Sequence, residues 1–428
     1  MLPITLCNGI DEKARFDQLK ARGGEVDAKV TAIMREIIAD VKARGDEAVR
    51  EYVLRFDKAD LERFEVPRAQ MEAAVEQCDP KFIAAIRRAS VNIRAFHERQ
   101  LRQSWFTNGA HGVMLGQRIR ALHRVGIYAP GGTAVLPSSV LMNAIPAKIA
   151  GVKEIILATP PWQGKADPRM LAAACVAGVD RVFMMGGSPA VPALAYGTES
   201  VPKVDKIVGP GNIYVTTAKK LLYGVVDIDM IAGPSEILII ADETANPEYL
   251  AADLLSQAEH DILASAVLIC TDRAVIEQTL AALTRQLEAL PRKEIAMKSL
   301  QNFGAVFLCD GVEQAIELSN EFAPEHLELC VKNPMEWLGY VDNAGSVFLG
   351  GDSPESVGDY YAGTNHVLPT GGTPRFFSPL SVDDFIKKMQ FIYYTKPALD
   401  IAKEDVITLA EAEGLTAHAN AVRVRVRS

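Results

Sequence analysis

From about residue 120 onward, the hydrophobic positions of the chain alternate between short apolar runs and longer helical repeats. The first such unit has an apolar run at residues 125–128, a glycine-rich turn, a helical repeat at residues 138–150 and a second apolar run at residues 154–159. Short apolar runs that end at glycine or proline predict buried strands, so this order predicts a βαβ unit. Further strands are predicted at residues 181–185, 206–209, 237–241, 265–270, 305–309 and 346–349.

Strands that alternate with helices predict parallel sheets with helices on both faces. The alternation fills two successive blocks, residues 121–230 and residues 231–368, and each block predicts a doubly wound α/β domain. In the second block, one long helix is expected over residues 273–300.

The segment before these blocks is charged and lacks the strand pattern. Residues 1–120 contain helical repeats at residues 30–52 and 80–101, and they predict a helical N-terminal region. Asp79 followed by Pro80 predicts a helix start, because Asp caps a helix and Pro suits its first position.

The segment after the blocks, residues 369–428, predicts a C-terminal tail. Two helices are expected in it, at residues 382–394 and 399–413. The tail ends in alternating Val and Arg at residues 422–427. This alternation favours a half-buried edge strand over a basic arm for nucleic acid.

Composition and charge narrow the function classes. The chain has 428 residues, of which 49% are hydrophobic, and a formal net charge of -9, which disfavours nonspecific binding to nucleic acid. The six cysteines form no C-x-x-C pair, so we expect free thiols in a reducing compartment. The N-terminus lacks a signal-peptide pattern, and no apolar run is long enough to span a membrane. We therefore expect a soluble cytoplasmic protein.

A helix expected over residues 246–260 ends in Gln257 and His260, which lie three residues apart and so face the same side. An amide oxygen and an imidazole nitrogen on one face are half of a metal site, with the other ligands coming from distant parts of the chain. The alternative is a helix cap or a surface pair.

Three glycine-rich turns, at residues 130–132, 186–187 and 209–212, follow predicted strands. Such turns present backbone N–H groups and a helix N-terminus to a phosphate, which favours nucleotide binding. None matches the G-x-G-x-x-G fingerprint, and tight connections are the alternative. Ser235 and Glu236 after a Gly-Pro turn offer polar groups for a substrate, or simply form the turn.

Four of the seven histidines lie in segments punctuated by glycine or proline. Glu325 and His326 are adjacent and suit acid–base chemistry, because His titrates near neutral pH. Further candidate ligand groups follow in two later segments: Asp359, His366, Glu413 and His418. The grouping of His260, His326, His366 and His418 favours one composite site over scattered histidines.

In their order along the chain, these motifs resemble the histidinol dehydrogenase family over nearly the full length. The segments that carry the resemblance are residues 125–133, 137–143, 207–212, 228–236, 251–261, 323–327, 358–370 and 413–420. The resemblance implies two successive incomplete Rossmann-like domains and a homodimer whose C-terminal parts interlock with the partner. It also implies two-step oxidation of L-histidinol to L-histidine through the aldehyde, with two NAD and a bound zinc ion.

Carried over position by position, the resemblance implies a role for each candidate residue. The zinc ligands would be Gln257, His260, Asp359 and His418. The acid–base pair would be Glu325 and His326. The substrate contacts would be Ser235, Gln257, His260, His326, Asp359, Glu413 and His418. The cofactor-contacting positions would be Tyr128, Pro189 and Asn212.

Pro189 departs from the family pattern, because the family usually has Gln at this position. Proline has no side-chain hydrogen bond to offer and no backbone donor, which puts one cofactor contact in doubt. With Pro192 it also predicts that the following helix, expected at residues 191–196, starts late or bends.

Three other functions fit parts of the same pattern. A related dehydrogenase would oxidise another polar alcohol, such as a sulfonated diol, although Glu413 and His418 favour histidinol. A zinc-dependent hydrolase would use Glu325 to activate water with no redox step. A silent ligand-binding module would bind the cofactor without turnover.

Overall fold

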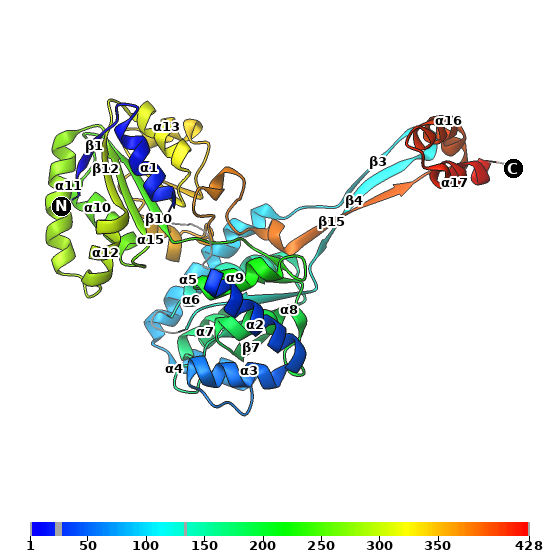
Figure 1. Cartoon of the computed structure of the whole chain (residues 1–428), viewed down its shortest axis with the longest axis horizontal. Coiled ribbons are helices and arrows are strands. Elements are labelled where there is room, and N and C mark those ends of the chain that lie inside the picture. The colour runs from blue at the N-terminus through cyan, green and yellow to red at the C-terminus, as the bar shows by residue number, and fades with distance from the viewer. Residues whose placement is uncertain (1, 22–27, 132–134, 427–428) are drawn as a thin grey trace. The chain divides into compact units, whose positions relative to one another are not determined.

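The computed structural model describes residues 2–21, 28–131 and 135–426. Contacts divide the chain into two compact units (Figure 1). Unit 1 comprises Met1–Gln100 with Leu122–Phe385, and unit 2 comprises Leu101–Ala121 with Ile386–Ser428. Gly132 of the first predicted glycine turn and Arg427 of the predicted edge strand lie outside the described residues.

The first sheet of unit 1 has the order β2-β7-β6-β5-β8-β9. Its strands are β2 (Glu65–Val66), β5 (Arg124–Tyr128), β6 (Glu154–Thr159), β7 (Arg181–Met184), β8 (Lys206–Val208) and β9 (Asp227–Ile228). All neighbours are parallel except β2 and β7. The chain therefore winds outward from β5 in both directions, as a doubly wound sheet does.

Helices cover both faces of this sheet because alternate strand residues point to opposite sides. Ile155 and Leu157 pack in one apolar cluster, whereas Ile156 and Ala158 pack in another. The first cluster contains α4 (Arg68–Gln77), α5 (Pro80–His97), α6 (Pro137–Ala150) and α7 (Pro168–Ala177). The second contains α2 (Ala28–Arg44), α3 (Asp46–Tyr52), α8 (Gly187–Tyr196) and α9 (Ile213–Leu222).

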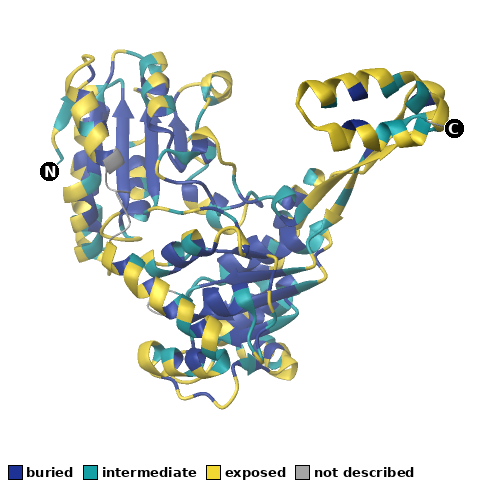
Figure 2. Ribbon diagram, turned by 45° about the vertical axis from the view of Figure 1, so that its right-hand side comes forward, coloured by how far each residue is buried: buried dark blue, intermediate teal, exposed yellow. Residues whose placement is uncertain are grey.

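The second sheet of unit 1 is fully parallel, with the order β1-β12-β11-β10-β13-β14. Its strands are β1 (Ile4–Leu6), β10 (Glu236–Ala241), β11 (Ser265–Cys270), β12 (Gly304–Leu308), β13 (His326–Cys330) and β14 (Ser346–Leu349). One face carries α10 (Pro247–Ala258), α11 (Arg273–Glu288) and α12 (Lys293–Phe303). The other carries α1 (Asp11–Ala21) and α13 (Val312–Phe322). Strands β10, β11 and β13 of this sheet are buried along their whole length, and Figure 2 shows buried strands in dark blue.

The first 120 residues contribute to several parts of the molecule. β1 joins the second sheet, and β2 joins the first. In unit 2, β3 (Trp105–Asn108) and β4 (Met114–Ala121) form an antiparallel sheet with β15 (Ile386–Tyr393). Two helices, α16 (Lys396–Ala412) and α17 (Thr416–Val426), follow β15 in the same unit.

The predicted α/β class with doubly wound parallel sheets and a helical C-terminal tail is confirmed, whereas three predictions inside these regions are wrong. Residues 382–394 are not a helix: a short 3-10 turn, Val382–Phe385, leads into β15, whose pairing with β4 outweighs its local pattern. The end of the tail is not an edge strand, because residues 422–426 continue α17. The predicted helix over residues 273–300 is interrupted near Pro291, since proline cannot continue a helix without losing a hydrogen bond.

The helix after the second glycine turn also differs from expectation. α8 begins at Gly187 and not late, so Pro189 is its third residue. The first N–H groups of a helix have no partner within the helix, so proline removes no hydrogen bond there. Pro192 lies inside α8 as well, and the helix runs through it to Tyr196. In the part of the chain that the structure describes, no helix is long and apolar enough to cross a membrane.

We predict that Phe307→Ala strongly destabilises the second sheet. The Phe307 ring is fully buried and stacks on Phe16 of α1, with ring centroids 4.7 Å apart. Deleting a buried aromatic side chain costs about 3–5 kcal/mol of unfolding free energy. Chemical denaturation followed by circular dichroism measures this cost. Phe376→Ala is the control, because that side chain is 72% exposed, and equal losses in the two variants would contradict the packing described.

Candidate active site

A cavity of about 230 Å³ in unit 1 gathers most of the predicted site residues. Its walls include the turn after β8 and the residues at the start of β10 and β13. It therefore lies at the carboxyl edge of the first sheet and at the amino edge of the second. Helix α10 runs back against β10, so its C-terminal end reaches the same place.

Gln257 and His260 reach the cavity from the end of α10. The helix ends at Ala258, and His260 follows in a turn in which its backbone N–H donates to the Gln257 carbonyl at 3.1 Å. Gln257 is fully buried, yet its Oε1 has no hydrogen-bond partner among the described residues. A buried amide oxygen without a partner is costly, so this oxygen is suited to bind a ligand.

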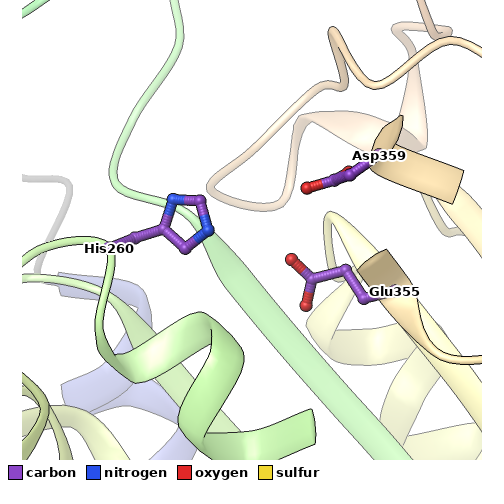
Figure 3. Close-up of side chains that lie close together, drawn as sticks. All are labelled: His260, Glu355 and Asp359. Atoms are coloured by element: carbon purple, nitrogen blue, oxygen red, sulfur yellow. The ribbon is translucent and has the colours of Figure 1, made fainter. Parts of the chain in front are cut away.

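Two carboxylates of α15 (Glu355–Tyr360) face His260 across the cavity (Figure 3). Glu355 and Asp359 are four residues apart, so they lie on one side of this helix. One ligand atom from each of His260, Glu355 and Asp359 lies within 4.8 Å of the others. Sequence reasoning missed Glu355, although its spacing from Asp359 in a short helical run was a usable signal.

The charges around this cluster favour a bound cation. Burial, followed by the nearby charges of Asp359 and Glu325, raises the pKa of Glu355 well above its usual range. Two carboxylates, an imidazole and an amide oxygen make a mixed nitrogen and oxygen set, which suits Zn²⁺ and related ions. A divalent cation would offset the cost of burying these carboxylates. The residues of the cavity therefore fit a metal ion.

The tautomer of His326 follows from its backbone partner. His326 is the first residue of β13 and pairs with Ile237 of β10. Its Nδ1 lies 2.8 Å from the Glu236 carbonyl oxygen, which can only accept, so Nδ1 carries the proton. Nε2 is then the basic nitrogen, and it has no hydrogen-bond partner among the described residues.

The surroundings of His326 keep it neutral and close to the carboxylates. Its Nε2 lies 3.8 Å from Asp359 Oδ1 and 4.0 Å from Glu355 Oε1. Burial lowers the pKa of His326, although the charge of Asp359 acts in the opposite direction. His326 is thus a neutral imidazole with an available lone pair, which is the form that a general base requires.

Glu325 is held beside His326 by a reciprocal contact with Glu236. The Glu236 N–H donates to Glu325 Oε2 at 2.8 Å, and the Glu325 N–H donates to Glu236 Oε2 at 3.3 Å. Glu325 Oε2 lies 3.7 Å from His326 Nδ1. Both glutamates are buried, and Glu325 lines the cavity.

The opposite wall contains the turn Gly209-Pro210-Gly211 after β8. Gly209 has φ +109°, and a Cβ on it would lie 2.1 Å from the Tyr128 carbonyl oxygen, so only glycine fits. Its N–H donates to Asp229 at 2.8 Å, and Asp229 forms a buried ion pair with Lys219. The turn is therefore held rigidly against the end of β5.

The first helix turn of α8 is less available to a phosphate than the sequence predicted. The Gly186 N–H donates to the Asp57 carboxylate at 2.9 Å, and the Tyr128 hydroxyl lies beside Gly187. Burial raises the pKa of Asp57 to about 6, against the lowering effect of the Gly186 N–H. The Asp57 side chain thus occupies the Gly186 donor, and sequence reasoning missed Asp57.

The remaining predicted residues lie in three places. Ser235 and His366 line the cavity, and His366 Nδ1 is 3.0 Å from the Asp359 carbonyl oxygen. Asn212 lies next to the first sheet, where its side-chain oxygen caps α9. Glu413 and His418 belong to unit 2, where both are exposed. His418 lies in α17.

The predicted residues are thus brought together only in part. Ser235, Gln257, His260, Glu325, His326 and Asp359 line one cavity. Tyr128 and Pro189 are buried next to α8, in the half formed by the first sheet. The roles assigned to all of these residues stay predictions.

Comparison with known proteins agrees with the motif order. The sequence-family model described as histidinol dehydrogenase matches residues 20–426. The chain is 51% identical to the histidinol dehydrogenase of Clostridium acetobutylicum over 419 residues, which cover 98% of this chain and 97% of that protein. It is 52% identical to the histidinol dehydrogenase of Bacillus cereus over 412 residues, which cover 96% of each chain.

A solved structure agrees as well. The crystal structure of histidinol dehydrogenase from Elizabethkingia anophelis aligns with a TM-score of 0.93 and 41% sequence identity. The alignment covers 100% of this chain and 98% of that chain. The chain therefore belongs to the histidinol dehydrogenase family and is an oxidoreductase.

Proposed function

We propose that this protein catalyses the last steps of histidine biosynthesis in the cytoplasm, the zinc-dependent and NAD-linked oxidation of L-histidinol to L-histidine through L-histidinaldehyde. The observation that carries the proposal is the grouping in one cavity of a neutral His326, Glu325 and the cluster His260, Glu355 and Asp359. Family membership supports the substrate, and six free cysteines support a reducing compartment.

The proposed zinc ligands are Gln257, His260, Asp359 and His418. The unpartnered Oε1 of Gln257 and the closeness of His260 to Asp359 support the first three. When bound, zinc would hold and orient the substrate's amine and imidazole and would act as a Lewis acid. Glu355 lies near enough to serve as a further ligand or to pair with a cationic group of the substrate.

In the first oxidation, His326 Nε2 accepts the proton of the substrate hydroxyl while hydride leaves the carbinol carbon. The hydrogen bond from Nδ1 to the Glu236 carbonyl supports this role, because it fixes the ring and stabilises the charged imidazole that forms. His326 then returns its proton to solvent. The product of this step is the aldehyde.

In the second oxidation, Glu325 removes a proton from a water molecule that adds to the aldehyde carbon. The Glu236 N–H supports this role, because it holds the Glu325 carboxylate in place. His326 again accepts a hydroxyl proton while hydride leaves the hydrated carbon, and the carboxylate of histidine results. Glu413 and Ser235 are proposed to bind the polar groups of the substrate.

NAD would supply the hydride acceptor in both oxidations. We propose that it binds at the carboxyl edge of the first sheet, with Tyr128, Pro189 and Asn212 at contact positions. The rigid Gly209 turn and the N-terminus of α9 support this location. Pro189 can offer only an apolar contact, so this contact should be weaker than one with a Gln side chain.

We further propose a homodimer in which Glu413 and His418 of one chain complete the site of the other. Both residues are exposed within the chain. Unit 2 also exposes large apolar side chains that a partner could cover: Trp105, Phe106, Leu115, Met389, Ile392, Tyr393, Ile401 and Leu409. Exposed apolar patches of this kind mark protein interfaces.

Complete turnover of histidinol should yield two NADH per molecule, measured by absorbance with limiting substrate. A chelator should abolish turnover and remove the bound metal, measured by elemental analysis, and added Zn²⁺ should restore both. A chelated, metal-free enzyme with full activity would contradict the metal site. No NADH with histidinol but NADH with another polar alcohol would point to a related dehydrogenase, and hydrolysis without NADH would point to a hydrolase.

His326→Asn and Glu325→Gln should affect the two oxidations differently. His326→Asn should slow alcohol oxidation about 10²–10⁴-fold, because it removes the general base. Glu325→Gln should slow aldehyde oxidation more than alcohol oxidation, because only the aldehyde needs activated water. Single-turnover kinetics with histidinol and with histidinaldehyde separate the two steps.

The pH profile gives a check on the His326 variant. Burial lowers the pKa of His326, so wild-type kcat/KM should persist to a pH below the usual histidine range and then fall as the base is protonated. His326→Asn should lose this acidic limb. Near-normal turnover of His326→Asn, or equal losses in both steps for Glu325→Gln, would refute the assigned roles.

Subunit mixing should test the shared site. His260→Ala and His418→Ala should each be inactive alone. When the two chains are co-expressed, heterodimers should contain one intact site, so random pairing should restore about one quarter of wild-type activity. A site built within one chain predicts no restoration. His260→Ala mixed with itself is the control.

A further inference from the structure

Two cysteines far apart in sequence meet at the carboxyl edge of the second sheet. β1 and β12 are parallel neighbours with Leu6 opposite Leu308, so Cys7 and Cys309 form the next pair along. The Cys7 N–H donates to the Leu308 carbonyl at 3.0 Å, which extends the pairing past the end of β1. The two Sγ atoms are 2.8 Å apart, and both thiols are buried.

We propose that Cys7 and Cys309 are a redox modification site, at which a reversible disulfide fastens β1 to β12. Neighbouring strands lie about 4.8 Å apart, which is within the Cα separation of roughly 4.4–6.8 Å that a disulfide spans. Both side chains point to the same face of the sheet, into the apolar cluster that contains Phe16 and Phe307. The backbone therefore needs no rearrangement for the bond to form.

The two cysteines have different parts in the reaction. Cys7 precedes an exposed turn, residues 8–10, and is 9% exposed against 3% for Cys309. The contact with Cys7 and burial raise the pKa of the Cys309 thiol, as do the charges of Glu12 and Asp310. Cys7 is therefore the sulfur that a small oxidant reaches first, and Cys309 is the resolving thiol.

With hydrogen peroxide as the oxidant, the reaction balances in two steps. The Cys7 thiolate attacks one peroxide oxygen and the O–O bond breaks, which gives Cys7 sulfenic acid and hydroxide. The hydroxide takes up the proton that the Cys7 thiol released and becomes water. Cys309 Sγ then attacks Cys7 Sγ, the S–O bond breaks, and a second water leaves with the Cys309 proton. Peroxide gains the two electrons that the thiols lose.

The bond would matter most for the N-terminal strand. β1 has three residues, lies at the edge of the sheet and pairs with β12. A cross-link between residues 7 and 309 would restrict the unfolded chain and keep β1 paired when the edge opens. The candidate active site lies at the opposite, amino edge of this sheet, so turnover should not change.

The test uses the full-length protein treated with hydrogen peroxide. Titration of the six thiols in denaturant should show the loss of two, and peptide mass spectrometry should find Cys7 joined to Cys309. The melting temperature should rise by roughly 3–8 °C and return after dithiothreitol. Persistence of all the thiols under peroxide, or a cross-link between other cysteines, would overturn the proposal.

Variants make the test specific. Cys7→Ser and Cys309→Ser should each abolish the cross-link and the thermal shift. Cys270→Ser is the matched control, because Cys270 ends the next strand, β11, but packs on the other face of the sheet. Cys270→Ser should retain both effects, and their loss in this variant would also count against the proposal.

Discussion

The pairing of β10 with β13 in a single register is the constraint on which the site depends. Because Ile237 lies opposite His326, the Glu236 carbonyl oxygen accepts a hydrogen bond from the imidazole Nδ1. The Glu236 N–H donates to the carboxylate of Glu325. A slip of one residue would turn His326 to the other face of the sheet, as the two-residue period of a strand requires. The register thus selects the tautomer and the orientation of the base, and sheet stability and chemistry rest on the same hydrogen bonds. Buried main-chain partners of this kind cannot be rearranged cheaply.

The cavity also concentrates negative charge that the protein alone does not neutralise. Burial raises the pKa of Glu355. Burial also raises the pKa of Glu328, and it raises the pKa of Asp253 to about 6. After burial, the nearby charge of Asp253 is the next cause that raises the pKa of Glu328. Glu328 in turn accepts the Glu355 N–H at 2.9 Å, so this pair supports the helix that carries Asp359. Carboxylates kept buried at such a cost are common at functional sites.

Most strands could be predicted from the sequence, because a buried parallel strand is a short apolar run with glycine or proline at its ends. The errors lie where partners outweigh local pattern. Residues 386–393 are mostly exposed, and only their pairing with β4 makes them a strand. Residues 422–426 alternate as a strand would, yet an ion pair from Arg423 to Glu411 helps to hold them as a helix against α16. In the site, the candidate motifs included His260 and Asp359, whereas Glu355 was missed despite its four-residue spacing from Asp359. Asp57 lies in no motif and became visible only through its neighbours in space.

The two sheet edges that form the cavity differ in electrostatic character, so each edge favours a different kind of ligand. Ligands in doubly wound sheets usually gather at the carboxyl edge, where helices begin and their N-termini attract anions. The first sheet follows this rule, since α9 begins beside the Gly209 turn. The second sheet presents its amino edge, where α10 ends, and the C-terminal end of a helix favours cations. A metal ion is therefore favoured on the Gln257 and His260 side, and phosphate groups are favoured on the other. The helix ends at the two sheet edges thus favour a cation on one side of the cavity and anions on the other, whatever side chains line it.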